Sequence, residues 1–225
     1  MSQLIDRFAP DFVLPIVGGG RFSLTDWRGQ IVVLTFWSAD CPWSRRADVA
    51  LVYRQLSWEP KGVRILGIAS NRNETEGQLR AEAQARHLKY PVVRDADQAI
   101  ANLYGVKTTP HFFVLDRQSY VRYTGALDDV TRAGQKPSTI YLDEAVTALL
   151  ANRSPNPPTT APFGSPIVTR AYAAAEPARS EEAPAAGPST AKASPTALPE
   201  TAPAGQPTTP APTTPIPPSS GSSAT

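Results

Sequence analysis

The stretch TFWSADCPWSRR, residues 35–46, contains Cys41, the only cysteine of the chain. It begins inside IVVLTFW (31–37), a nearly continuous apolar and β-branched run that is typical of a strand buried on both faces. Pro42 suits the first turn of a helix, where its missing N–H costs nothing. The residues that follow, 42–58, have helical spacing, with an apolar stripe formed by Val49, Val52, Tyr53 and Leu56. The sequence therefore predicts that Cys41 lies between a buried strand and the N-terminus of a helix.

Strand and helix patterns alternate on both sides of this junction. FVLP (12–15) and RFSL (21–24) predict a hairpin with a glycine-rich turn. The downstream segments predict strands over 62–70, 90–95, 111–116 and 120–125, and helices over 73–87, 98–105 and 138–153. Asn73 with Glu76 three residues later predicts the N-terminal cap of the first of these helices. The order β-α-β followed by β-β-α predicts an α/β fold with a central mixed sheet flanked by helices.

The composition changes near Ser154. Most of the 24 prolines follow it, in long runs of Ala, Thr, Ser and Pro. Such a segment buries too little apolar surface to offset the entropy of ordering it. We therefore expect one domain over residues 1–153 and a disordered tail over 154–225.

Charge and hydropathy limit the classes of partner. The formal net charge of +2 at pH 7 gives no reason to expect nucleic-acid binding. The N-terminus lacks the pattern of a secretory signal, and no stretch has the length and hydropathy of a membrane span. These features favour a cytoplasmic protein.

Three segments in series carry a resemblance to a known family: FWSADCPWS, YGVKTTPHFFVLD and the pair YTGALDD and YLDEAVTALL. In this order and spacing they resemble the thioredoxin-like superfamily, and within it the redoxin branch related to AhpC/TSA, which carries an N-terminal β-hairpin. The likeness covers roughly residues 8–152. It implies that the Thr109–Pro110 bond is cis, and that the backbone before it lies beside the reactive cysteine and can pair with an extended substrate strand.

Physical chemistry gives Cys41 a role consistent with this resemblance. Unpaired N–H groups and the positive end of a helix dipole stabilise a thiolate relative to a thiol. Ser44 is expected to hydrogen-bond to that thiolate. The candidate catalytic residues are Cys41, Ser44, Thr109 and Pro110, and the candidate substrate-binding residues are Pro42, Trp43 and His111. A proton-transfer role for His111 is a further possibility.

The chain departs from the family in lacking a resolving thiol. A dithiol site needs a second cysteine to release a mixed disulfide, and Ser44 stands at that position. Some redoxins of this subgroup carry another cysteine near the end, in a GC-x-I context; here the segment reads FGSPI, with Ser165 at that place.

Three hypotheses follow. The favoured one is a monothiol thiol-disulfide oxidoreductase with a role in cell redox homeostasis and antioxidant activity. It would act on protein or low-molecular-weight disulfides, with an external thiol such as glutathione as reductant and with no cofactor or metal. The second is a one-cysteine peroxidase, although Leu34 and Ser38 stand where its pattern has Pro and Thr. The third is a redox-inactive binding module in which Cys41 is only a small buried hydrophobe.

Overall fold

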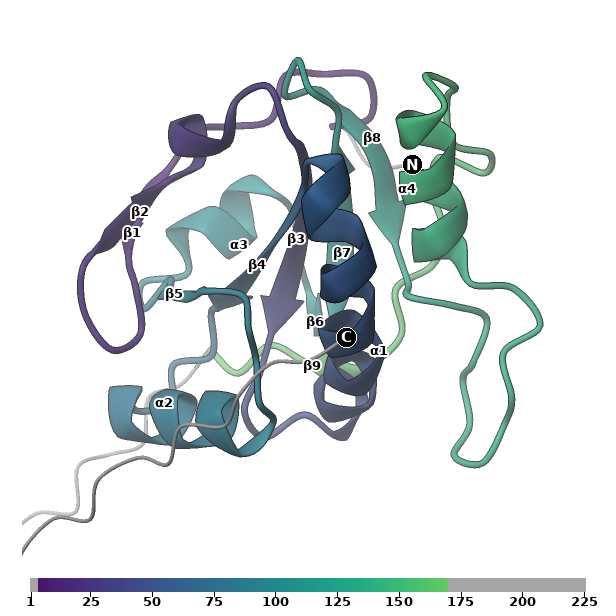
Figure 1. Ribbon diagram of the computed structural model, residues 1–225. Helices are drawn as coiled ribbons and strands as arrows, with labels where there is room; N and C mark the ends of the chain where they lie inside the picture. Colours follow the sequence, from purple (N-terminus) through teal and green to yellow (C-terminus); the bar gives the residue numbers. More distant parts are fainter. Residues whose placement is uncertain (1–3, 170–225) are drawn as a thin grey trace, which may run out of the picture. The chain divides into compact units, whose positions relative to one another are not determined.

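The computed structural model describes residues 4–169, and its central element is a five-stranded mixed sheet (Figure 1). The strand order is β5-β4-β3-β7-β8. β3 pairs in parallel with β4 and antiparallel with β7, so it lies at the centre, and all seven of its residues are buried. The strands are β3 (Ile31–Trp37), β4 (Val63–Ala69), β5 (Val92–Arg94), β7 (His111–Leu115) and β8 (Val121–Gly125). The predicted α/β fold with a mixed sheet is confirmed.

Helices cover both faces of the sheet, because side chains of alternate strand residues point to opposite sides. One face packs against α1 (Pro42–Trp58), α2 (Glu76–Ala85) and α4 (Tyr141–Leu150). The other packs against α3 (Ala99–Leu103) and the N-terminal hairpin of β1 (Val13–Pro15) and β2 (Arg21–Ser23). Two short 3₁₀ helices, η1 (Leu24–Trp27) and η2 (Glu59–Lys61), follow β2 and α1. Figure 1 shows α1 in front of the sheet and α3 behind it.

The predicted apolar stripe of α1 is wrong. Val49, Tyr53 and Leu56 are 62%, 72% and 71% exposed, and Val52 is half-buried. The buried face instead carries Ala47, Asp48 and Leu51. Asp48 is buried because the core supplies its hydrogen-bond partners, which the periodicity of apolar residues could not reveal.

The cap of α2 also differs from the prediction. Thr75, not Asn73, is the N-cap, and it forms a capping box with Gln78. The Thr75 hydroxyl accepts from the Gln78 N–H at 3.3 Å, and the Gln78 side chain accepts from the Thr75 N–H at 2.8 Å. This shift of two residues leaves Glu74 in the preceding loop, where it is 1% exposed.

Residues 154–169, assigned to the tail from the sequence, pack against the domain. The Thr124 N–H donates to the Pro158 carbonyl and the Thr160 N–H to the Thr124 carbonyl, both at 3.0 Å. Further on, β9 (Ser165–Pro166) pairs antiparallel with β6 (Thr108–Thr109). The predicted boundary after residue 153 is therefore corrected for this segment, because long-range backbone pairing orders a Pro-rich stretch that has no local strand pattern. The rest of the predicted tail, 170–225, lies outside the described residues. Within 4–169 no helix is long and apolar enough to cross a membrane.

Candidate active site

Cys41 is the N-cap of α1, directly after the loop that follows β3. Its sulfur accepts a hydrogen bond from the Ser44 N–H, with 3.4 Å between N and Sγ. As a thiol it donates to the Thr109 carbonyl, with 3.0 Å between Sγ and O. The Cys41 side chain is 2% exposed. The sulfur therefore lies at a helix N-terminus, as the sequence predicts, and beside the end of β6, as the family resemblance implies.

The Thr109–Pro110 bond is cis, which the family resemblance implied. β6 ends at Thr109, and its antiparallel register places Ser165 of β9 opposite Thr109. A second segment of the chain therefore lies along the backbone that precedes the cis proline. This segment covers the sulfur of Cys41.

The pKa of Cys41 is below the ordinary value of a thiol. Burial alone would raise this pKa, but hydrogen bonds to the sulfur outweigh it. In decreasing order of effect the donors are the Ser165 hydroxyl, the Ser44 N–H, the Ser165 N–H and the Thr109 hydroxyl. The donor set favours the thiolate, which is the nucleophilic form of cysteine.

Ser44 contributes its backbone more directly than its side chain. Its N–H faces the sulfur, whereas its hydroxyl accepts from the Ser38 N–H at 3.3 Å. Arg45 and Arg46 do not bond to the sulfur; they pair with Glu82 at 3.0 Å and Asp128 at 2.6 Å. Among Ser44, Arg45 and Arg46, only the neutral Ser44 N–H hydrogen-bonds to the sulfur.

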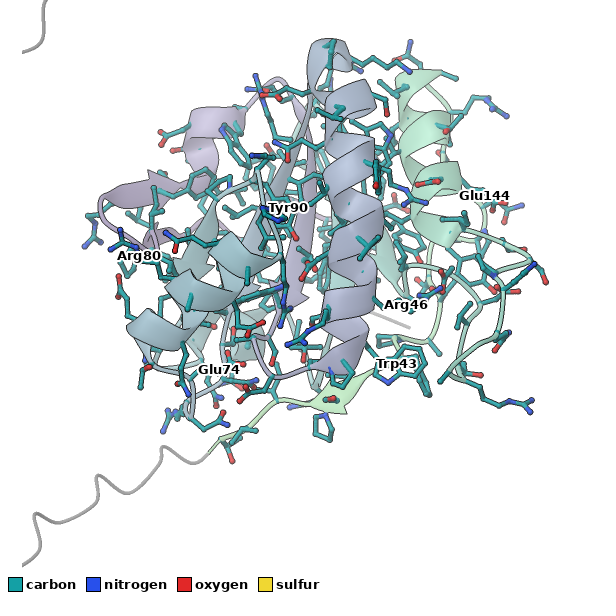
Figure 2. All side chains as sticks on the ribbon, turned by 60° about the horizontal axis from the view of Figure 1, so that its bottom comes forward. Trp43, Arg46, Glu74, Arg80, Tyr90 and Glu144 are labelled. Carbon is teal, nitrogen blue, oxygen red and sulfur yellow. The ribbon has the colours of Figure 1, made fainter. Side chains whose placement is uncertain are left out.

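The candidate substrate-binding residues separate into two places. Pro42 is exposed and Trp43 half-buried beside Cys41, where the Trp43 ring packs edge-on against Phe163 with centroids 4.7 Å apart. Figure 2 shows Trp43 next to the pale green segment that contains β9. His111 instead stacks on Phe113 with centroids 4.8 Å apart, among the side chains that face α3.

His111 is buried and its Nε2 lies 2.9 Å from the Thr124 hydroxyl. Burial lowers the pKa of His111 to about 4. The ring is therefore neutral at pH 7, and no contact with Cys41 occurs among the hydrogen bonds of the described residues. His111 directly follows Pro110, but its side chain contacts Thr124 and Phe113.

A buried polar network that the sequence analysis missed lies under the Cys41 loop. Glu74 Oε1 accepts from the Ser38 hydroxyl at 2.6 Å, the Asp40 N–H at 3.2 Å and the Asn71 amide at 3.2 Å. The Ser38 hydroxyl in turn accepts from the Cys41 N–H at 3.1 Å. The network fixes the loop that carries the sulfur, and Figure 2 places Glu74 near this end of α1.

A second network ties the same loop to the core. Asp48 accepts from the Trp37 indole at 2.8 Å, the Tyr90 hydroxyl at 2.6 Å and Arg86 at 2.9 Å. Arg86 also donates to the carbonyls of Ser38 and Ala39. The opposite charges of Asp48 and Arg86 and their hydrogen bonds compensate for the burial of both side chains. Neither network has a signal in the sequence, because Asn71, Glu74 and Arg86 lie in polar segments where charged and amide side chains are expected at the surface.

No group of three or more His, Cys, Asp or Glu side chains within the described range has an arrangement that could hold a metal ion.

Comparison with known proteins assigns the family. The sequence model of the AhpC/TSA family matches residues 5–124, which is more than half of the chain. The chain belongs to the AhpC/TSA family. It is 34% identical over 116 residues to a protein named thiol-disulfide oxidoreductase ResA from Geobacillus thermodenitrificans, covering 51% of this chain and 64% of that protein. The match thus spans less than two thirds of this relative.

Solved structures of similar fold support the architecture. A hypothetical protein from Sinorhizobium meliloti superimposes with a TM-score of 0.69 at 30% identity, over 74% of this chain and 95% of the other. The peroxidoxin BcpB from Mycobacterium tuberculosis has a TM-score of 0.53 at 21% identity, over 68% of this chain and 99% of the other. At that identity the second likeness shows only the thioredoxin-like fold, which the family members share.

Proposed function

We propose that this protein is a thiol-disulfide oxidoreductase of the redoxin type that acts through Cys41 alone. The observation that carries the proposal is the position of the sulfur, which receives N–H and hydroxyl donors and lies against the backbone before a cis proline. The name of the Geobacillus relative gives the same reaction class.

The reaction has two exchange steps. The Cys41 thiolate attacks one sulfur of a disulfide, forming a mixed disulfide while the other sulfur leaves as a thiolate and takes up a proton from solvent. An external thiolate, such as that of glutathione, then attacks the mixed disulfide at the substrate sulfur. Cys41 leaves as a thiolate, and the substrate sulfur is left in a disulfide with the external thiol. After these two steps at Cys41, a second external thiolate attacks the external-thiol sulfur of that disulfide and releases the substrate as a thiolate. The two external thiols end as their own disulfide and so supply the two electrons that reduce the substrate.

The donors around the sulfur serve both steps. They favour the thiolate of Cys41 before the attack, and the donors outside β9 stabilise the same thiolate when it leaves in the second step. The Thr109 hydroxyl and the Ser44 N–H come from the protein framework, whereas the Ser165 donors come from β9. Within the described residues Cys41 is the only thiol, so the second step depends on an external reductant.

The test is the formation and release of a mixed disulfide. The reduced full chain is incubated with glutathione disulfide, and its intact mass is measured before and after addition of glutathione. We expect one glutathione adduct per chain, its removal by excess glutathione, and no adduct on a Cys41→Ser variant. Absence of an adduct would contradict the proposal. Sulfenic acid formation with peroxide in the same sample would then favour the peroxidase, and an unreactive thiol would favour the binding module.

A further inference from the structure

The segment over residues 162–168, here called the strap, lies across Cys41. Its backbone follows β6 in antiparallel pairing, with Thr109 opposite Ser165 and Thr108 opposite Pro166. The Ile167 N–H continues the ladder by donating to the Lys107 carbonyl at 3.0 Å. An added strand that pairs through backbone groups is a common mode of peptide recognition. The strap therefore has the geometry of a bound peptide.

Consecutive residues of the strap contact different parts of the candidate active site. Phe163 packs on Trp43, and Ser165 lies opposite Thr109, whose carbonyl oxygen is 3.0 Å from the sulfur of Cys41. Gly164 lies against the end of β6: a Cβ on this residue would be 1.9 Å from the Thr109 carbonyl oxygen. That position accepts glycine only, since the contact is with rigid backbone. Aromatic, glycine and small polar residues thus occupy three consecutive positions over the thiol.

The far end of the strap is anchored to polar groups near the buried network. The Val168 N–H donates to Asn71 Oδ1 at 2.8 Å. The Val168 carbonyl accepts from the Gln98 amide at 2.8 Å and from the Arg72 N–H at 3.1 Å. Asn71 also donates to the Ser38 hydroxyl at 2.9 Å. The C-terminal end of the strap therefore contacts the network under the Cys41 loop, whereas Phe163 contacts Trp43 in the first turn of α1.

We propose that the strap occupies the groove in which a substrate strand binds, and that its residues define the substrate class. That class is an extended protein segment with cysteine in the place of Ser165, glycine in the place of Gly164 and an aromatic residue before it. This inference rests on the proposed thiol exchange at Cys41. Because the strap occupies this groove, it must be displaced before a substrate can exchange with Cys41. The strap therefore also protects the Cys41 thiol from reaction.

The pairing of the strap with β6 indicates which substrate sulfur Cys41 attacks. Ser165 lies opposite Thr109, whose carbonyl oxygen is 3.0 Å from the Cys41 sulfur, so a substrate cysteine in the register of Ser165 lies beside Cys41. The Cys41 thiolate attacks this sulfur and forms a disulfide between the two chains. The substrate's former disulfide partner leaves as a thiolate, so the electrons balance without another reactant.

The first experiment opens the strap in the full chain. Gly164→Ala introduces the clash with the Thr109 carbonyl, whereas Gly77→Ala in α2 is the matched control, because a Cβ there meets no atom within 4 Å. We expect Gly164→Ala to raise the rate of Cys41 alkylation by iodoacetamide at neutral pH at least tenfold, and Gly77→Ala to leave it unchanged. Equal rates in wild type and Gly164→Ala, with circular dichroism showing both folded, would overturn the protective role. If Gly164→Ala fails to fold, Phe163→Ala serves the same comparison by removing the contact with Trp43.

The second experiment tests the substrate class with peptides APFGCPIV and APFACPIV, each joined through its cysteine to thionitrobenzoate. Attack by Cys41 of the opened variant on the peptide sulfur releases the coloured thiolate and leaves the peptide on the protein. We expect the glycine peptide to react at least tenfold faster than the alanine peptide. Equal rates would overturn the substrate class and leave the proposed function standing. Fast alkylation without reaction with either peptide would overturn the proposed function, and with it the substrate class, while the protective strap would stand.

Discussion

His111 should link the stability of the fold to pH. Its folded pKa of about 4 lies below the unfolded value of 6.5, so the fold favours the neutral ring. The resulting stabilisation is fully present above pH 6.5 and is lost as the pH falls toward the folded pKa. For these two values the linkage relation gives a loss of about 2 kcal/mol at pH 5 and about 3 kcal/mol at pH 4. The cause is the desolvation of an imidazolium among Phe113 and its apolar neighbours.

Urea unfolding of wild type and His111→Gln at several pH values between 7 and 4 measures this loss. Glutamine is neutral throughout and offers a polar atom to Thr124, so carboxylate titration is common to both proteins and cancels in their difference. We expect the stability advantage of wild type to shrink by about 3 kcal/mol over this range. His87→Asn is the matched control, since His87 is exposed and asparagine tolerates its positive φ of 54°. A difference between wild type and His111→Gln that stays constant with pH would refute the reasoning.

Two further substitutions test the groups beneath and beside the sulfur. Glu74→Ala removes the acceptor of the Ser38 hydroxyl and the Asp40 N–H, and it should lower the free energy of unfolding in urea by about 2–4 kcal/mol. Glu76 is exposed, so Glu76→Ala should lower this free energy by less than about 1 kcal/mol. Equal losses in the two variants would contradict the role of the network. Ser44→Cys places a thiol one helical turn from Cys41 and should allow reduction of insulin disulfides by a dithiol reductant without an accumulated adduct; an adduct that persists in this variant would show that position 44 cannot resolve it.

Much of the fold follows from periodicity in the sequence. The run over 31–37 has the composition of a strand buried on both faces, and it is the centre of the sheet. The hairpin over 12–24 and the strands over 111–125 also match their predicted places, because turn residues separate short β-rich runs. The position of Cys41 at a helix N-terminus follows from a strand pattern that changes to a helical one at Pro42.

The buried polar groups could not be predicted in this way. Asp48 and Glu74 are charged residue types that periodicity assigns to the surface, yet each has several hydrogen-bond partners from distant segments. Such partners are brought together only by the tertiary fold. The predicted burial of the apolar stripe of α1 failed for the same reason, because a helix that buries Asp48 turns Val49 and Tyr53 toward solvent.

The strap was missed for a different reason. The residues FGSPI contain glycine and proline, which disfavour an independent strand, and the surrounding composition predicts disorder. Their order comes from pairing with β6 and from contacts with Trp43 and Asn71, which lie far away in sequence. The sequence drew attention to Ser165 only through the family resemblance, and the structure places it against Cys41.

The central claim, that Cys41 is an activated thiolate, is tested most directly by the pH dependence of its alkylation. The rate of iodoacetamide incorporation into the full chain is followed by intact mass from acidic to alkaline pH, with Cys41→Ser as the blank. Hydrogen bonds from Ser165, Ser44 and Thr109 outweigh burial and lower the pKa of Cys41, so the midpoint should lie below that of a free cysteine in an unstructured peptide measured alongside. A midpoint equal to or above that of the peptide would contradict the account.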